Sequence, residues 1–203
     1  MSINQIQGGN NPNTTVHVAP DGRMLARTVN TAEQEHAAQN GDTYSIDSGV
    51  ITLTDDLTTP VLYLRNTGED RALNVSRLAL TALASTGGVG PVLVSLIGAV
   101  TGGSILAAAE APLKNFNVTS ARTLAADARR GATGATVESA NPEPVLRALF
   151  PAAPVFAVAE YNHIVVPRGG SIALTVTPPV GNTSMVVLVA LNVFLSDSTG
   201  VSR

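Results

Sequence analysis

Side chains that do chemistry in proteins are sparse and scattered in this sequence. The three histidines, His17, His36 and His163, stand far apart, and there is no cysteine. A zinc site needs several nitrogen or sulfur ligands at a defined spacing, whereas the densest grouping, Glu33-Gln34-Glu35-His36, contains one histidine. We interpret that grouping as a solvated polar turn, and we predict neither a metal site nor a bound cofactor.

The common catalytic patterns are missing too. The neighbouring carboxylates Asp55-Asp56 follow a predicted strand, where they would point in different directions, so we interpret them as a turn. The segment Arg129-Arg130 before Gly131-Ala132-Thr133-Gly134 resembles a phosphate loop only superficially, because it lacks the lysine and the strand–loop–helix context. There is no GxSxG pattern for a serine nucleophile. The sequence therefore predicts a protein that is not an enzyme.

Charge also limits the partners. Charged residues make up 13% of the chain and the formal net charge is −3, so nothing attracts a nucleic acid. Lys114 is the single lysine, and a surface poor in hydrated lysines indicates contact with other proteins. The uncharged run between Arg77 and Glu110 is broken by several glycines and Pro91, and its apolar pieces have the length of strands. We therefore predict no membrane segment.

The elements that would position any site are mainly strands. Val50–Thr54 alternates, and Val61–Asn66 and Leu73–Leu80 follow it after short turns. Ser171–Thr177 and Met185–Leu195 are the clearest runs near the other end. Strand and turn signals at intervals of about 8–12 residues are typical of a sandwich or barrel. We predict a mainly β fold, an antiparallel β-sandwich.

Met185–Leu195 is nearly all apolar. That pattern fits a central strand covered on both faces, or a strand at a subunit interface.

Residues outside these strands are expected to be irregular. Residues 1–43 are polar and turn-rich, and we predict an extended N-terminal arm with short strands near residues 15–18 and 24–29 and one or two helical turns over Thr31–Ala38. Residues 44–203 would form the sandwich, with long Ala/Gly-rich loops between about 82 and 155. Within these loops, Asn141–Phe150 predicts a short helix, with Asn141 as its N-cap and Pro142 in its first turn.

The order of the turn segments resembles that of small bacteriophage virion proteins with a jelly-roll-like β-sandwich. The residues that carry the resemblance are spread over most of the chain, and each is ordinary turn chemistry between strands. They are Asn13–Arg23, Glu35–Tyr44, Thr59–Asn66, Lys114–Asn117 with Gly131–Val137, Pro167–Leu174 and Gly181–Met185.

The resemblance implies a capsid decoration (cement) protein on the outer capsid surface of the virion. Such a protein would be a homotrimer that bridges major capsid protein subunits and stabilises the shell, with its arm across its neighbours. Residues expected to contact the capsid are Asn10, Pro12, Thr15, His17, Arg23 and Arg27. Residues expected in the core or at the trimer interface are Val187, Val189, Leu191 and Val193.

Two other interpretations remain open. In the first, the chain is another virion component, such as a head-fibre base, a tail adaptor or a receptor-binding subunit. A non-viral glycan-binding sandwich is the second, although aromatic residues are only 3% of the chain and there is no tryptophan to stack on a sugar.

Overall fold

The computed structural model describes residues 17–18, 24–25, 33–88, 90–151 and 155–196. The chain divides into two compact units, residues 1–32 and 33–203. In the first unit, β1 (His17–Val18) pairs antiparallel with β2 (Met24–Leu25), where the sequence predicted short strands. The rest of the predicted arm up to residue 32 lies outside the described residues. The predicted helical turns are present as α1 (Glu33–Gln39), which belongs to the second unit.

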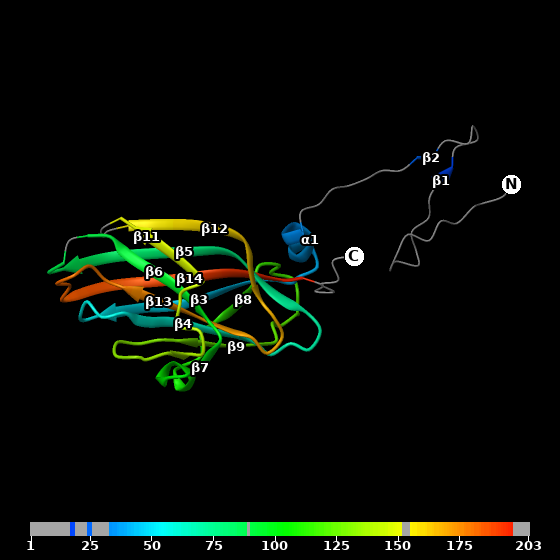
Figure 1. Cartoon of the computed structure of the whole chain (residues 1–203). Coiled ribbons are helices and arrows are strands. Elements are labelled where there is room, and N and C mark those ends of the chain that lie inside the picture. The colour runs from blue at the N-terminus through cyan, green and yellow to red at the C-terminus, as the bar shows by residue number, and fades with distance from the viewer. Residues whose placement is uncertain (1–16, 19–23, 26–32, 89, 152–154, 197–203) are drawn as a thin grey trace. The chain divides into compact units, whose positions relative to one another are not determined.

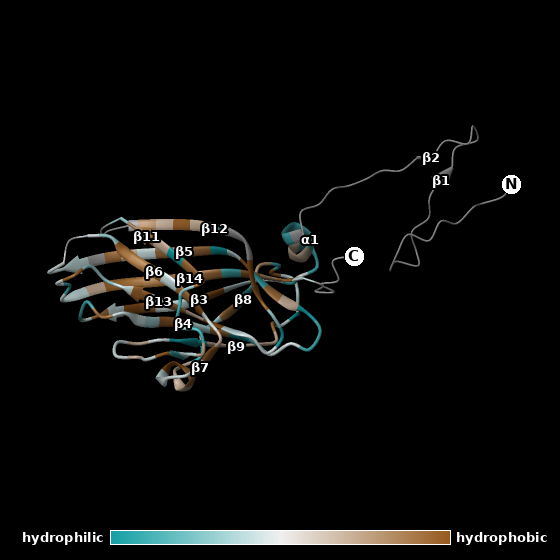
Figure 2. Cartoon of the chain, in the orientation of Figure 1, coloured by the Kyte–Doolittle hydropathy of each residue, from teal (hydrophilic) through white to brown (hydrophobic). Residues whose placement is uncertain are grey.

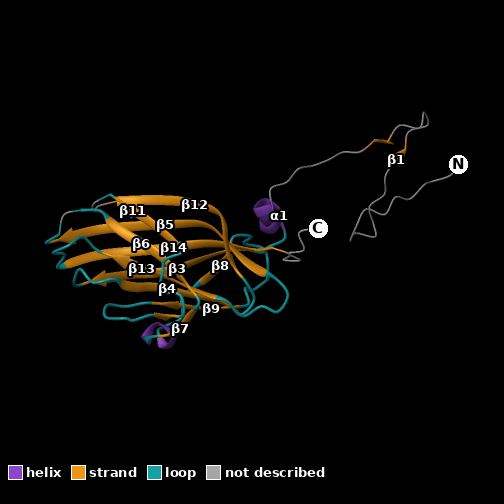
Figure 3. Cartoon of the chain, viewed as in Figure 1, coloured by secondary structure: helices purple, strands orange, loops and turns teal. Residues whose placement is uncertain are grey.

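Two five-stranded antiparallel sheets form the second unit (Figures 1 and 3). The first, which we call the β14 sheet, has the order β12-β5-β14-β3-β8, and the second, the β13 sheet, has the order β11-β6-β13-β4-β9. The bounds are β3 (Thr43–Leu53), β4 (Thr59–Asn66), β5 (Ala72–Thr86), β6 (Val92–Gly98), β8 (Leu113–Asn115), β9 (Ala126–Arg130), β11 (Leu146–Phe150), β12 (Val155–Val166), β13 (Ser171–Thr177) and β14 (Ser184–Ser196).

The strand order is that of a jelly roll. Four strands pair with the last four in reverse order: β3 with β14, β4 with β13, β5 with β12, and β6 with β11. Alternate pairs lie in opposite sheets, so the chain folds as a long antiparallel ribbon wrapped into two layers. The predicted mainly β antiparallel sandwich, jelly-roll-like, is therefore confirmed.

The segment between β6 and β11 is an insertion into that ribbon. It contains β7 (Val100–Gly102) paired with β10 (Glu138–Ser139), and the 3₁₀ helix η1 (Ser104–Ala107). It also contributes β8 and β9, which each extend one sheet at its edge. The predicted long loops are thus more regular than expected.

The predicted helix over Asn141–Phe150 is wrong, because β11 occupies its second half. Leu146, Ala148 and Phe150 pack against the core while Arg147 and Leu149 are exposed, which is the two-residue period of a strand. The Asn141 N–H takes no part in a helix. It donates a hydrogen bond to Ser139 Oγ at 3.0 Å.

The core lies between the two sheets, and the hydrophobic residues along their strands are seen in Figure 2. In β14 the odd-numbered side chains point inward and the even-numbered ones outward. Val187, Val189, Leu191 and Val193 are all at most 1% exposed and belong to the core cluster. Of the two alternatives for these four residues, the structure places them in the core of the single chain.

The outer faces of the two sheets differ. On the β13 sheet, η1 packs against β4 and β9. Ile105 in η1 and Tyr63 in β4 are both buried, although neither belongs to the core between the sheets. The insertion therefore covers this outer face with a second, smaller apolar layer.

Candidate functional site

The residues that sequence analysis tested for chemistry do not assemble into a reactive site. His36 is exposed, and its ring nitrogen Nδ1 lies 3.3 Å from the amide nitrogen of Asn40. Asp55 Oδ1 accepts the Leu57 N–H at 3.1 Å, which is the local turn that the sequence predicted. Asp56 Oδ2 instead accepts the N–H of Gly181, in the loop between β13 and β14, at 2.9 Å. Among the described residues, no group of three or more His, Cys, Asp or Glu side chains is placed to hold a metal ion.

The basic segment before Gly131 is also structural. Arg129 donates from Nε to Asp127 Oδ1 at 2.6 Å and from Nη1 to the carbonyl of Ala108 at 3.4 Å. The bond to Ala108 joins β9 to the segment after η1, and the bond to Asp127 lies within β9. In the described part of the chain, no helix follows Gly131 and Gly134, so this segment presents no helix N-terminus to a phosphate.

The predicted capsid contacts fall almost entirely outside the described residues. Asn10, Pro12, Thr15, Arg23 and Arg27 lie there, and of His17 only the backbone is described, opposite Leu25 in the β1–β2 pair. His163 lies in β12, likewise with only its backbone described.

Asp42 is the most strongly paired buried charge. Arg71 donates to it from Nη1 at 2.6 Å and from Nη2 at 3.2 Å, and Arg122 donates from Nη1 to both oxygens at 2.9 Å. Burial by itself raises the pKa of Asp42, but the hydrogen bonds and charges of the two arginines outweigh it, so its pKa lies below the ordinary value. The main chain of Asp42 joins α1 to β14, since its N–H donates to Ala37 and its carbonyl accepts from Leu195. The cluster of Asp42, Arg71 and Arg122 therefore joins the elements at one end of the sandwich, and we interpret it as structural.

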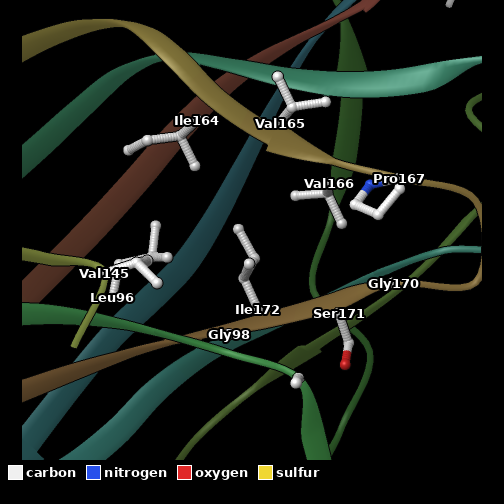
Figure 4. A pocket seen from close by; sticks show the side chains of 11 residues that line it. Leu96, Gly98, Val145, Ile164, Val165, Val166, Pro167, Gly170, Ser171 and Ile172 are labelled. Atoms are coloured by element: carbon white, nitrogen blue, oxygen red, sulfur yellow. The ribbon is translucent and has the colours of Figure 1, made fainter. Parts of the chain in front are cut away.

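An apolar cavity of about 390 Å³ opens at one edge of the sandwich, between the ends of β6 and β12 (Figure 4). Ile164 and Val166 from β12 face Leu96 from β6 across it. The lining residues are Leu96, Gly98, Ala99, Val145, Ile164, Val165, Val166, Pro167, Gly170, Ser171 and Ile172. None of them titrates, so the cavity has no group for acid–base or nucleophilic chemistry.

The one side-chain hydroxyl in the lining is already engaged. Ser171 Oγ accepts the Val100 N–H at 3.0 Å and donates to the Val100 carbonyl at 3.2 Å. A ligand in the cavity would therefore meet carbon almost everywhere. The arrangement is suited to an aliphatic group, and a sugar or phosphate would lose its hydrogen bonds to water without replacement.

Exposed apolar side chains surround this edge. Val145 and Val165 line the cavity and are 57% and 51% exposed, and Leu149 and Phe156 on the edge strands β11 and β12 are more exposed still. Sequence analysis missed all four. The signal for Val145 and Leu149 was the alternation in 145–150, which the helix prediction concealed.

Ala99, at the mouth of the cavity, has a φ of 51° and is the one described non-glycine residue with a positive φ. That conformation costs an L-residue about 1–2 kcal/mol, and it follows directly after β6. The Ala99 N–H donates to the Ser171 carbonyl at 2.9 Å, and its own carbonyl accepts from Ala140 at 3.1 Å. These two bonds hold the strained turn in place.

We expect Ala99→Gly to raise the free energy of unfolding by about 0.5–1 kcal/mol, because glycine adopts positive φ without the Cβ clash. Thermal unfolding followed by circular dichroism measures the effect. The control is Ala140→Gly, at a residue without positive φ, which should lower stability by a similar amount. Equal destabilisation by both variants would contradict the strain at Ala99.

Comparisons with known proteins add no family to this description. No protein-family model matches the chain, and no curated protein matches it. In the described residues, every helix is too short or too polar to reach across a bilayer.

Proposed function

We propose that the chain is a structural protein of a bacteriophage virion that decorates the outer surface of the capsid. It would bind the major capsid protein, bridge neighbouring subunits and stabilise the shell, working as a homotrimer. The observation that carries the proposal is the complete jelly-roll strand order together with an apolar cavity at one edge of the sandwich. Jelly rolls are frequent in viral capsids, lectins and cupins, so the fold alone does not distinguish these functions and the residues of the site must be compared as well.

The two other common uses of the fold fit this chain less well. A cupin holds a metal with a cluster of histidines and carboxylates, and the described residues contain no such cluster. A lectin stacks sugars on grouped aromatic rings. The exposed aromatic side chains among the described residues are Phe116, just after β8, and Phe156 on β12, and these strands are the two opposite edges of the β14 sheet. They are too far apart to hold one sugar.

Stabilisation of a shell by such a protein is mechanical. Each copy contributes modest contacts, and linking several copies turns later contacts into intramolecular ones, which raises the overall affinity by about 10²–10⁴. Among the described residues, no strand pairs with the outer side of the edge strands β11 and β12, and Arg147 and Glu160 are the only charged residues in them. Residues 1–32 would add further contacts as an arm, by pairing with an exposed strand of the capsid.

The test is co-sedimentation of the purified chain with empty capsids of its phage. The full chain should sediment with the shell in many copies, whereas a fibre or tail component would bind in few copies at one vertex. A chain lacking residues 2–30 keeps every strand of the sandwich, so it should retain its circular dichroism spectrum but bind capsids about 100-fold more weakly.

A matched control replaces residues 2–30 with a Gly/Ser segment of the same length, and it should bind as weakly as the deletion. Undiminished binding by the deletion would remove the arm from the interface. Failure of the full chain to bind capsids would remove the decoration role itself.

A further inference from the structure

The outer face of the β14 sheet has a group of apolar side chains at its centre. Its central row runs from Phe156 through Thr81 and Leu188 to Val50, which are cross-strand neighbours on β12, β5, β14 and β3. Phe156 and Val50 are 69% and 65% exposed. Other apolar residues on this face are Ala79, Leu83, Val158, Val186 and Ala190.

The even-numbered residues of β14 explain why its sequence fitted two interpretations, a central strand covered on both faces or a strand at a subunit interface. Both of its faces are apolar, but only the odd-numbered side chains are fully buried. Val186, Leu188 and Ala190 remain partly exposed on the outer face. The β13 sheet has its outer face covered by the insertion, whereas no helix or strand in the described residues packs over the middle of the β14 sheet.

Charges on this face are few and of both signs. Glu160 on β12 stands directly opposite Arg77 on β5, and Asn192 on β14 continues the same row. Asp47 and Lys114 add one charge of each sign on β3 and β8. The face is thus neutral as a whole, with an apolar area beside a polar one. Two copies of this face can meet without net repulsion, because its charges sum to zero.

The size of the face also suits association with a like surface. Its four long strands have 11 to 15 residues. At ~4.8 Å between strands and ~3.3 Å per residue, four strands of this length cover roughly 750 Å². A stable protein–protein interface of standard size buries about 800 Å² on each partner.

We propose that the outer face of the β14 sheet is the surface through which copies of this chain associate with one another. The apolar row around Leu188 forms the buried centre of that interface, and the row of Glu160, Arg77 and Asn192 forms its polar rim. This proposal rests on the proposed function, which expects the chain to act as an oligomer. It adds the surface through which the copies associate. It uses Phe156 on β12 for self-association and leaves the cavity, the edge strand β11 and the arm free for the capsid.

The test is light scattering during size-exclusion chromatography of the full chain without capsids. The wild-type chain should have a mass of about three times 20.8 kDa, as expected for the proposed homotrimer. The double variant Val50→Lys/Phe156→Lys places two cations on either side of Leu188 and should elute at the mass of one chain. Both positions are largely exposed, so the fold should persist, and an unchanged circular dichroism spectrum checks this.

The matched control is Val118→Lys/Leu149→Lys, which makes the same chemical change at exposed residues away from this face. It should remain oligomeric. A single-chain mass for the wild type, or an oligomer that survives the Val50→Lys/Phe156→Lys change, overturns the proposal. Capsid co-sedimentation distinguishes failure of this proposal from failure of the proposed function. An oligomer that does not bind capsids would contradict the decoration role alone. A single chain that binds capsids through this face would contradict self-association alone.

Discussion

Replacing Asp42 with Asn is expected to lower the free energy of unfolding by about 2–3 kcal/mol at neutral pH. Asp42 is 5% exposed and accepts hydrogen bonds from two guanidinium groups, and an amide accepts fewer bonds and balances no charge. The loss is smaller than for a fully buried triad because the side chains of Arg71 and Arg122 are 31% and 55% exposed, so water solvates them in the variant. Urea unfolding of the two proteins measures the difference.

Asp127→Asn is the control for this change. It removes the same charge from the Asp127–Arg129 pair, in which both side chains are about one-third exposed. An exposed pair contributes about 0–1 kcal/mol, so the control should be nearly neutral. Equal losses from the two variants would show that burial of Asp42 has no special effect.

The effect of Asp42 should also depend on pH, with a definite sign. Its folded-state pKa is lowered, so its carboxylate stabilises the fold fully above the unfolded pKa of about 3.9, and this contribution is lost as the pH falls through the lower folded value. The gap in stability between wild type and Asp42→Asn should therefore be constant from pH 5 to pH 7 and shrink below about pH 4. A gap that stays constant down to pH 2 would contradict the lowered pKa.

Gly131→Ala is expected to destabilise the fold by at least about 3 kcal/mol, or to prevent folding. Gly131 follows β9, and its N–H donates to the Val61 carbonyl at 2.9 Å. A Cβ at this position would overlap the carbonyl oxygen of Pro60 and lie 2.8 Å from its carbonyl carbon and 3.0 Å from the Cα of Val61. These are main-chain atoms of the buried strand β4, so they cannot move aside as a side chain would.

Gly98→Ala is the matched control for Gly131→Ala. Gly98 also lies at a strand end, and a Cβ there would meet only Val145 Cγ1, at 3.8 Å, an ordinary van der Waals contact. Lower entropy of the unfolded chain should make this variant neutral or more stable by up to about 1 kcal/mol. Denaturant unfolding of both variants distinguishes the two cases, and similar stabilities would disprove the close approach at Gly131.

Local patterns in the sequence predicted most of the strands. Ser171–Thr177 is a strand with the predicted bounds, and Val61–Asn66 lies within β4, because alternation and turn residues are properties of short segments. The helix prediction over Asn141–Phe150 failed for the same local reason. Asn141-Pro142 has the composition of a helix start, but the fourth pair of the ribbon requires Leu146, Ala148 and Phe150 to lie beside β6. Tertiary pairing therefore overrode a local signal.

The candidate site was much less predictable than the strands. The cavity depends on a gap between strands of different sheets, β6 and β12, and no short pattern encodes that gap. The apolar run Met185–Leu195 indicated that Val187 and Leu191 lie in the core or at a subunit interface, but it did not distinguish the two. That distinction needed the position of β14 between β5 and β3.

The position of β14 has a consequence for how this protein is made. It is the last strand of the described chain to leave the ribosome, yet it lies in the middle of its sheet, between β5 and β3. Until it is synthesised, β3 and β5 each present an unpaired apolar edge, which is the kind of surface that draws nascent chains into aggregates. The β14 sheet therefore cannot be completed before β14 is synthesised, and chains that terminate before Ser184 should accumulate as insoluble material at any temperature that supports the intact protein.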